Sequence, residues 1–253
     1  MSGEFSELKC IVCSSKMTPY FKKTFLKFGL GEVEYVRCPS CQFVCSETHY
    51  KMTDNDWCAL NEAYHGEYFE IGHNPDDPRW IDRMIAQASV IASLVGVGIL
   101  KSDCALDYGA GDGRLADLLD EKGIFVDKYD KFISKSGYRA YEEMQPGGYD
   151  LVISTAVFEH VRCIETLDEI VSFVSEDGVL ALHTMIMEQA PRRSDWHYLV
   201  PVHCSFFSNK SMQKLFERWN FTHSFYHVES RMWFFFRNRK DMRNEFAGYW
   251  GEI

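Results

Sequence analysis

Three glycines at alternating positions follow a short apolar run in the segment Ala105-Leu-Asp-Tyr-Gly-Ala-Gly-Asp-Gly113. The apolar run ends in an acid, Asp107. Glycine accepts backbone angles that other residues avoid, and it lets a ligand approach the main chain closely. A strand that passes into such a loop and then into a helix forms a small-molecule site. The segment therefore predicts a strand, loop and helix with a ligand held at Gly109 and Gly111.

The chain after residue 103 alternates between strand and helix patterns. Strands are predicted over residues 104–108, 124–129, 149–154 and 179–184, and an antiparallel pair over 221–228 and 232–237. Helices are predicted over 79–95, 115–119, 167–174 and 212–219. The interval 130–149 is short for a helix and a strand, so we expect an abbreviated connection there. This order predicts an α/β class with a doubly wound, Rossmann-like sheet that is mostly parallel and ends in an antiparallel pair.

Polar residues stand where the predicted parallel strands end. Asp130 lies 23 residues after Asp107, at the end of the second strand, and Ser154-Thr155 ends the third. Ligands of doubly wound sheets bind outside these strand ends. An acid at the position of Asp130 can accept hydrogen bonds from both ribose hydroxyls of a nucleoside. The alternative is that Asp130 only caps the next segment.

Two CxxC pairs lie near the N-terminus, at Cys10-Ile-Val-Cys13 and Cys38-Pro-Ser-Cys41. Each pair places two thiolates on one side of a tight turn, and two such pairs complete a tetrahedral four-sulfur site that suits Zn²⁺. The residues between the pairs are expected to form a hairpin or a long loop. The motifs predict a small zinc-ribbon-like segment over residues 1–50 with a structural Zn²⁺; the alternative is a set of reduced thiols without metal.

Composition narrows the class of protein. The net charge of −10 disfavours a nucleic-acid surface, because phosphate binding needs a basic face. The longest mostly apolar run, residues 90–100, is too short for a membrane span, and the first residues lack the apolar core of a secretory signal. We therefore expect a cytoplasmic protein, whose nine cysteines are reduced rather than paired in disulfides.

Residues 80–237 resemble the class I S-adenosylmethionine-dependent methyltransferases, and more narrowly the small-molecule branch that carries a Glu-His pair after the fourth strand. The resemblance is carried by residues 106–113, Asp130, 149–153, the Glu-His pair in Val157-Phe-Glu-His-Val161, 177–180 and 203–208. It implies a domain over 79–253. The polar and aromatic linker before it, residues 51–78, is interpreted either as a helix that packs its aromatic side chains on that domain or as a lid over the ligand. It also implies that the glycine loop binds S-adenosylmethionine. The implied cofactor-binding residues are Asp107, Gly109, Ala110, Gly111, Asp130, Lys131, Phe132, Thr155 and Ala156.

The resemblance also implies the catalytic residues. His160 is the first candidate for the base that takes the proton of the acceptor, because imidazole titrates near physiological pH; His203 is the second, and Glu159 accompanies them. The alternative is that Glu159 and His160 only brace a helix. In a metal-assisted version known from some relatives, these three residues hold a divalent ion. Ala156 replaces a further ligand of that pattern, so we favour the metal-free version.

The N-terminal segment is similar to that of sugar methyltransferases. We expect transfer to an oxygen or nitrogen atom of a small polar acceptor, a carbohydrate among the candidates. The aromatic C-terminal residues are interpreted either as core or as the contact surface of a homodimer. Two alternatives stay open: an RNA methyltransferase with an N-terminal zinc site, and a scaffold on a degenerate methyltransferase fold that is not an enzyme.

Overall fold

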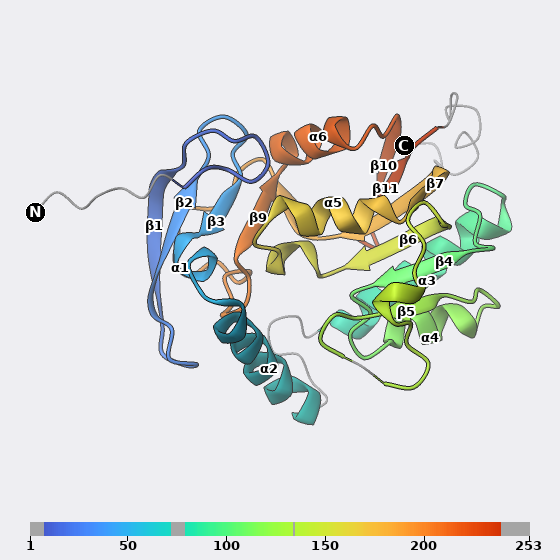
Figure 1. Ribbon diagram of the computed structural model, residues 1–253, viewed down its shortest axis with the longest axis horizontal. Coiled ribbons are helices and arrows are strands. Elements are labelled where there is room, and N and C mark those ends of the chain that lie inside the picture. Colours follow the sequence, from blue (N-terminus) through green and yellow to red (C-terminus); the bar gives the residue numbers. More distant parts are fainter. Residues whose placement is uncertain (1–7, 72–78, 134, 239–253) are drawn as a thin grey trace, which may run out of the picture. The chain divides into compact units, whose positions relative to one another are not determined.

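The computed structural model describes residues 8–71, 79–133 and 135–238. Contacts along the chain gather into two compact units, each of which is built from three stretches of chain. Figure 1 shows the helices and strands that these units contain. The first unit comprises Met1–Pro78, Phe158–Leu167 and Thr184–Arg218. The second comprises Arg79–Val157, Asp168–His183 and Trp219–Ile253. The segment boundaries at residues 50 and 78 stay sequence predictions about domains.

A six-stranded sheet with the order β10-β11-β7-β6-β4-β5 forms the second unit. The strands are β4 (Ala105–Tyr108), β5 (Asp127–Tyr129), β6 (Tyr149–Thr155), β7 (Val174–His183), β10 (His223–His227) and β11 (Met232–Phe236). The four strands β5, β4, β6 and β7 are parallel, whereas β11 and β10 form an antiparallel pair at the other edge. The predicted α/β class with a mostly parallel, Rossmann-like sheet is confirmed.

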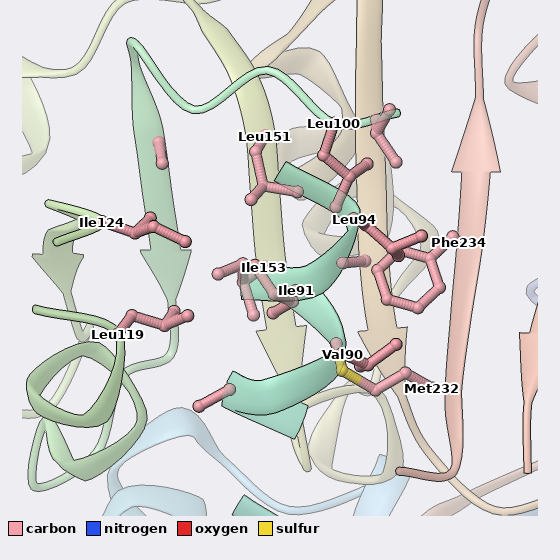
Figure 2. Packing of buried hydrophobic residues seen from close by; sticks show 14 of the residues in the cluster. Val90, Ile91, Leu94, Leu100, Leu119, Ile124, Leu151, Ile153, Met232 and Phe234 are labelled. Carbon is pink, nitrogen blue, oxygen red and sulfur yellow. The ribbon is translucent and has the colours of Figure 1, made fainter. Parts of the chain in front are cut away.

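Helices α3 (Trp80–Gly96) and α4 (Arg114–Asp120) cover one face of this sheet with apolar side chains. Figure 2 shows Ile91 and Leu94 of α3 packed against Leu151 and Ile153 of β6, with Phe234 of β11 beside them. Each such side chain that leaves water contributes about 1.5–3 kcal/mol to folding. This core holds the strand ends that carry the polar residues.

Two parts of the second unit bear on the sequence predictions. The helix predicted over 167–174 is shifted along the chain: α5 (Ile164–Ser172), whose residues are divided between the units, begins and ends earlier, and Val174 opens β7 by pairing with Tyr149. The connection between β5 and β6 is abbreviated, as expected. It contains a short 3-10 helix, η1 (Tyr141–Glu143), and a single parallel bridge between Lys128 and Tyr138.

The first unit contains a second sheet, with the order β1-β2-β3-β9-β8, which the sequence did not predict. Its strands are β1 (Thr18–Phe25), β2 (Gly31–Arg37), β3 (Val44–Ser46), β8 (Ile186–Met187) and β9 (Ser205–Ser208). The strands β1 and β2 form an antiparallel hairpin, which is one of the two forms expected between the CxxC pairs. The strand β9 joins from a distant part of the chain, since Val44 pairs with Phe206.

The helices of the first unit are α1 (Glu47–Tyr50), α2 (Asp54–Ile71), the 3-10 helix η2 (Phe158–His160) and α6 (Asn209–Arg218). Trp57 and Tyr64 of α2 pack with Val200 and Val202 of the loop before β9. Among the described residues, none of the helices combines the length and the apolar character that crossing a bilayer requires.

Candidate functional site

The glycine loop follows β4 directly, and its backbone is bound to the end of β5. The N–H groups of Gly109 and Ala110 both donate to the carbonyl oxygen of Tyr129, at 2.8 and 3.0 Å. Gly109 has φ +80°, and a Cβ atom there would lie 2.3 Å from Cγ2 of Val157. Only glycine fits this position, so the loop can approach β6 more closely than any other residue would permit.

Asp130 braces the loop from the end of β5. Its Oδ2 accepts a hydrogen bond from the Gly111 N–H at 2.9 Å, and its Oδ1 accepts from the N–H groups of Phe132 and Ile133 at 2.9 and 3.2 Å. The side chain therefore does cap the following segment. Both lone pairs of Oδ1 are used by these bonds, whereas Oδ2 keeps one, so the capping geometry leaves room for the predicted ribose contact at Oδ2.

Asp107 of β4 is a buried acidic residue of the second unit. Its side chain is 2% exposed, and its Oδ1 has no hydrogen-bond partner among the described residues. Burial, and then the charge of Asp130, raise the pKa of Asp107 to about 7. A buried carboxyl group without a donor is costly unless a ligand supplies one. An ammonium group fits this requirement.

Thr155 and Ala156 complete the edge at the end of β6. Ala156 has φ +56°, a left-handed conformation that is uncommon for a residue with a side chain, and its N–H donates to the His183 carbonyl at 2.9 Å. Strained backbone of this kind persists where the surrounding structure enforces it, often at functional sites. Lys131 and Phe132 follow Asp130 directly, and the Phe132 ring is half exposed. The structure therefore brings together nine predicted residues at the ends of β4, β5 and β6: Asp107, Gly109, Ala110, Gly111, Asp130, Lys131, Phe132, Thr155 and Ala156.

The four predicted cysteines of the first unit form one cluster. The Sγ atoms of Cys10, Cys13, Cys38 and Cys41 all lie within 4.8 Å of one another. The Sγ pairs Cys10–Cys41 and Cys13–Cys38 are 3.5 and 3.4 Å apart. Tetrahedral Zn²⁺ with Zn–S bonds of about 2.3 Å needs sulfurs about 3.8 Å apart, so the donor set fits this ion. The hydrogen bond from Cys10 lowers the pKa of Cys41 to about 6, which favours the thiolate.

The predicted catalytic residues form a second cluster of the first unit. Ligand atoms of Glu159, His160 and His203 lie within 4.8 Å of one another, and the two imidazole centroids are 5.0 Å apart. Glu159 is 1% exposed, whereas both histidines are half-buried. The backbone also joins the two parts of the cluster, because the Cys204 N–H donates to the Glu159 carbonyl at 2.8 Å.

Both histidines are neutral at pH 7. Burial lowers the pKa of His203 to about 3, and burial together with the neighbouring His203 and His65 holds the pKa of His160 well below its usual range. The Nδ1 of His203 donates to the Tyr198 carbonyl at 2.8 Å, because a carbonyl can only accept. Its Nε2 therefore carries a lone pair. The Nδ1 of His160 has no hydrogen-bond partner among the described residues.

The structure adds three contacts at these sites that the sequence did not predict. The Tyr198 hydroxyl donates to Glu159 Oε1 at 2.7 Å, and His65 of α2 lies with its ring centroid 5.4 Å from that of His160. In the second unit, the Tyr138 hydroxyl donates to the Gly111 carbonyl at 2.8 Å. These contacts join positions far apart in the chain, so no local motif could have indicated them.

Comparisons with known proteins agree with this fold. A family model described as a methyltransferase domain matches residues 79–223, more than half of the chain. A search of curated proteins finds no match. A crystal structure of Burkholderia thailandensis 1,6-didemethyltoxoflavin-N1-methyltransferase, with bound 1,6-didemethyltoxoflavin and S-adenosylhomocysteine, is similar with a TM-score of 0.51. The identity is 13%, over 85% of this chain and 97% of that one, so the likeness is one of fold. Magnesium protoporphyrin IX methyltransferase from Synechocystis PCC 6803, with bound S-adenosylhomocysteine, has a TM-score of 0.47 and 17% identity over 71% and 96% of the two chains.

Proposed function

Since the chain belongs to the methyltransferase-domain family and is an S-adenosylmethionine-dependent methyltransferase, we propose that it methylates an oxygen or nitrogen atom of a small polar metabolite. The observation that carries the cofactor assignment is Asp107, a buried carboxyl group with an unpartnered oxygen at the root of the glycine loop. The α-ammonium group of S-adenosylmethionine supplies the donor that this oxygen lacks.

The other predicted cofactor residues have distinct roles in the proposal. Gly109, Ala110 and Gly111 give the cofactor close access to the backbone, and Asp130 accepts hydrogen bonds from the ribose hydroxyls. Lys131 and the half-exposed Phe132 ring lie against the adenine, and Thr155 and Ala156 flank the sulfonium. Because the bound cofactor supplies an already activated methyl group, the protein needs only to align the acceptor and remove its proton.

We propose that the cluster of Glu159, His160 and His203 removes the proton of the acceptor. His160 is the base in this proposal, because its Nδ1 has no hydrogen-bond partner among the described residues and burial keeps the ring neutral. His203 is the second base, since the Tyr198 carbonyl fixes a tautomer with a lone pair on Nε2. Glu159 stabilises the imidazolium that forms. The first step is the transfer of an O–H or N–H proton from the acceptor to imidazole.

A metal-assisted version is the second candidate for this cluster. Its support is that two imidazole nitrogens and a carboxylate oxygen lie within 4.8 Å of one another, a donor set that first-row transition ions accept. In that version, Glu159, His160 and His203 would hold the ion, and the ion would supply the Lewis acidity that lowers the pKa of an acceptor oxygen. Dialysis against a chelator distinguishes the metal-free from the metal-assisted version. If the four-cysteine site retains its ion, the enzyme keeps its activity in the metal-free version and loses it in the metal-assisted version.

The four-cysteine cluster is proposed to hold structural Zn²⁺. All four donors come from the protein, so the ion has no open position for a substrate, and its contribution is to the stability of the first unit. Three strands of this unit's sheet, β3, β8 and β9, have four residues or fewer, and a metal that joins the two CxxC turns offsets the cost of ordering them.

We propose a small acceptor, with a carbohydrate or nucleotide sugar as the first class to examine. The net charge of −10 supports it over RNA, because an RNA substrate calls for a basic surface. We also propose that the protein is cytoplasmic and forms a homodimer.

The test is to incubate the purified full-length protein with S-adenosylmethionine and separate panels of sugars, nucleotide sugars, small amines and RNA. Formation of S-adenosylhomocysteine is then measured. We expect turnover with a small polar acceptor and its loss in His160→Gln. Turnover with RNA alone, together with tight retention on heparin at moderate salt, would contradict the proposed acceptor class. Failure to bind S-adenosylmethionine at all would favour a scaffold.

A further inference from the structure

We propose that Tyr138 is a positioning residue for the cofactor: together with Asp130, it holds both backbone groups of Gly111 and so presets the glycine loop. The inference rests on the assignment of this loop to S-adenosylmethionine under the proposed function. It gives a role to the abbreviated connection between β5 and β6, in which the sequence identified no such contact.

The two partners hold Gly111 from opposite ends of the residue. Its N–H donates to Asp130 Oδ2 at 2.9 Å, and its carbonyl accepts from the Tyr138 hydroxyl at 2.8 Å. Gly111 has φ +57°, and no atom lies within 4 Å of where a Cβ would stand. Side-chain packing on that side of the residue therefore does not hold its left-handed conformation. Gly111 lies within a turn that the Gly113 N–H closes by donating to the Ala110 carbonyl at 2.8 Å, and the bonds from Asp130 and Tyr138 hold its own N–H and carbonyl.

The contact belongs to a longer arm, residues 135–138, that follows the loop. Lys135 Nζ donates to the Asp112 carbonyl at 2.8 Å, and a Cβ at Gly113 would lie 2.8 Å from the Tyr138 hydroxyl oxygen. The arm therefore meets three consecutive residues of the loop. The residue that follows the arm anchors it to β5, because the Arg139 N–H donates to the Lys128 carbonyl at 2.8 Å.

The surrounding charges keep the Tyr138 hydroxyl a donor. Burial has the largest effect on the pKa of Tyr138, followed by the negative charges of Asp112 and Asp107, and all of them raise it above its usual range. The ammonium groups of Lys128 and Lys135 lie 5.9 and 4.9 Å from the ring centroid, where they interact with its face. Without the hydroxyl, the Gly111 carbonyl loses its partner, and the loop must be ordered when the cofactor binds, at a cost in affinity.

The test compares Tyr138→Phe with Tyr141→Phe in the full-length protein. Tyr141 lies in the same connection, and its side chain is 45% exposed. Calorimetry with S-adenosylmethionine should show a Kd raised about five- to tenfold in Tyr138→Phe, as expected for one lost hydrogen bond, and changed by less than about twofold in Tyr141→Phe.

A second measurement isolates the positioning role from a general loss of stability. Amide exchange of the cofactor-free protein, followed by NMR, should be faster at Gly111 in Tyr138→Phe and unchanged in β6. An unaltered Kd, or unaltered exchange at Gly111, would overturn the inference. If instead the wild-type protein does not bind S-adenosylmethionine, then the proposed function fails, and this result is distinct from equal binding by wild type and variant.

Discussion

The two compact units assemble polar sites in different ways. In the second unit, the chain reaches the same sheet edge at the end of each parallel strand, so Asp107 and Asp130 meet through the fold's own repetition. In the first unit, His160 and His203 come from two stretches of chain that join through β9 and the loop before it. A site formed at the ends of successive parallel strands can be predicted from the sequence, because each strand can be recognised locally. A site formed from distant stretches of chain depends on metal binding, burial and side-chain hydrogen bonds, which the sequence pattern does not show.

The largest expected effect tests the dependence of the first unit on metal. Cys41→Ser removes a buried ligand, so we expect loss of Zn²⁺ and unfolding of this unit, since structural zinc contributes about 10 kcal/mol. Zinc content, near-UV circular dichroism and limited proteolysis measure the change. Cys163→Ser, at an exposed cysteine of the same unit, is the control. A folded, protease-resistant Cys41→Ser protein would show that the cluster is not a structural metal site.

The next largest effect is the pH dependence of the stability of the first unit. Burial lowers the pKa of His49, which is 0% exposed, to about 4. The unfolded chain takes up this proton near pH 6.5 and the folded chain only near pH 4. The contribution of His49 to stability is therefore complete above pH 6.5 and is lost as the pH falls toward 4. Its full size is about 3 kcal/mol.

Urea unfolding between pH 4 and pH 7 measures this dependence. His49→Gln should reduce the slope, of which His160 and His203 supply a further part because their pKa values are also lowered, whereas His197→Gln, at an exposed position, should leave the slope unchanged. Asp107 acts in the opposite direction in the second unit, because its pKa is raised to about 7 and its burial costs stability as the pH rises from 4 to 7. Equal slopes for His49→Gln and wild type would contradict the assignment.

A third pair of variants probes the glycine loop. Gly109→Ala adds a Cβ 2.3 Å from Val157 Cγ2 to a residue with φ +80°, so we expect a loss of about 2 kcal/mol or more. Gly111→Ala enters open space at φ +57° and should cost about 1 kcal/mol. Denaturant unfolding of both variants measures the difference. A Gly111→Ala variant less stable than Gly109→Ala would show that the close approach to Val157 does not constrain the loop.

A further effect, smaller than that of Gly109→Ala, concerns the charge of Asp107. Asp107→Asn should weaken S-adenosylmethionine binding about tenfold, or about 1.4 kcal/mol, because the amide has no charge for the ammonium group. In the wild type, affinity should rise between pH 6 and pH 8 as the carboxyl group ionises, and this rise should vanish in the variant. Calorimetry at three pH values measures both, with Asp103→Asn, at an exposed position two residues before β4, as control. A pH dependence that persists in Asp107→Asn would exclude this residue as its source.

The sequence predicted what local pattern determines. Apolar runs gave the parallel strands, and the glycine spacing marked the loop at the end of β4, since both depend on neighbouring residues. The cysteine spacing likewise predicted a cluster that the structure shows. Val174 was misassigned because its spacing suits a helix, and pairing with Tyr149 across β6 and β7 decided otherwise.

What the sequence could not predict are contacts made across long stretches of chain. The pairing of β3 with β9 joins Val44 to Phe206, and nothing near either residue signals it. His65 reaches His160, and Tyr198 reaches Glu159, only because α2 and the loop before β9 pack together. Tyr138 lies in a connection with no clear period, so its hydrogen bond to Gly111 depends on the folded path.

The central claim is that the edge formed by β4, β5 and β6 binds S-adenosylmethionine through two aspartates. Calorimetric titration of the full-length protein with S-adenosylmethionine, for wild type, Asp130→Ala and the exposed control Asp120→Ala, tests it most directly. We expect binding by wild type and Asp120→Ala, and a loss of at least about tenfold in Asp130→Ala, which lacks both the ribose contact and the brace on Gly111. Equal affinity in Asp130→Ala and wild type would contradict the account.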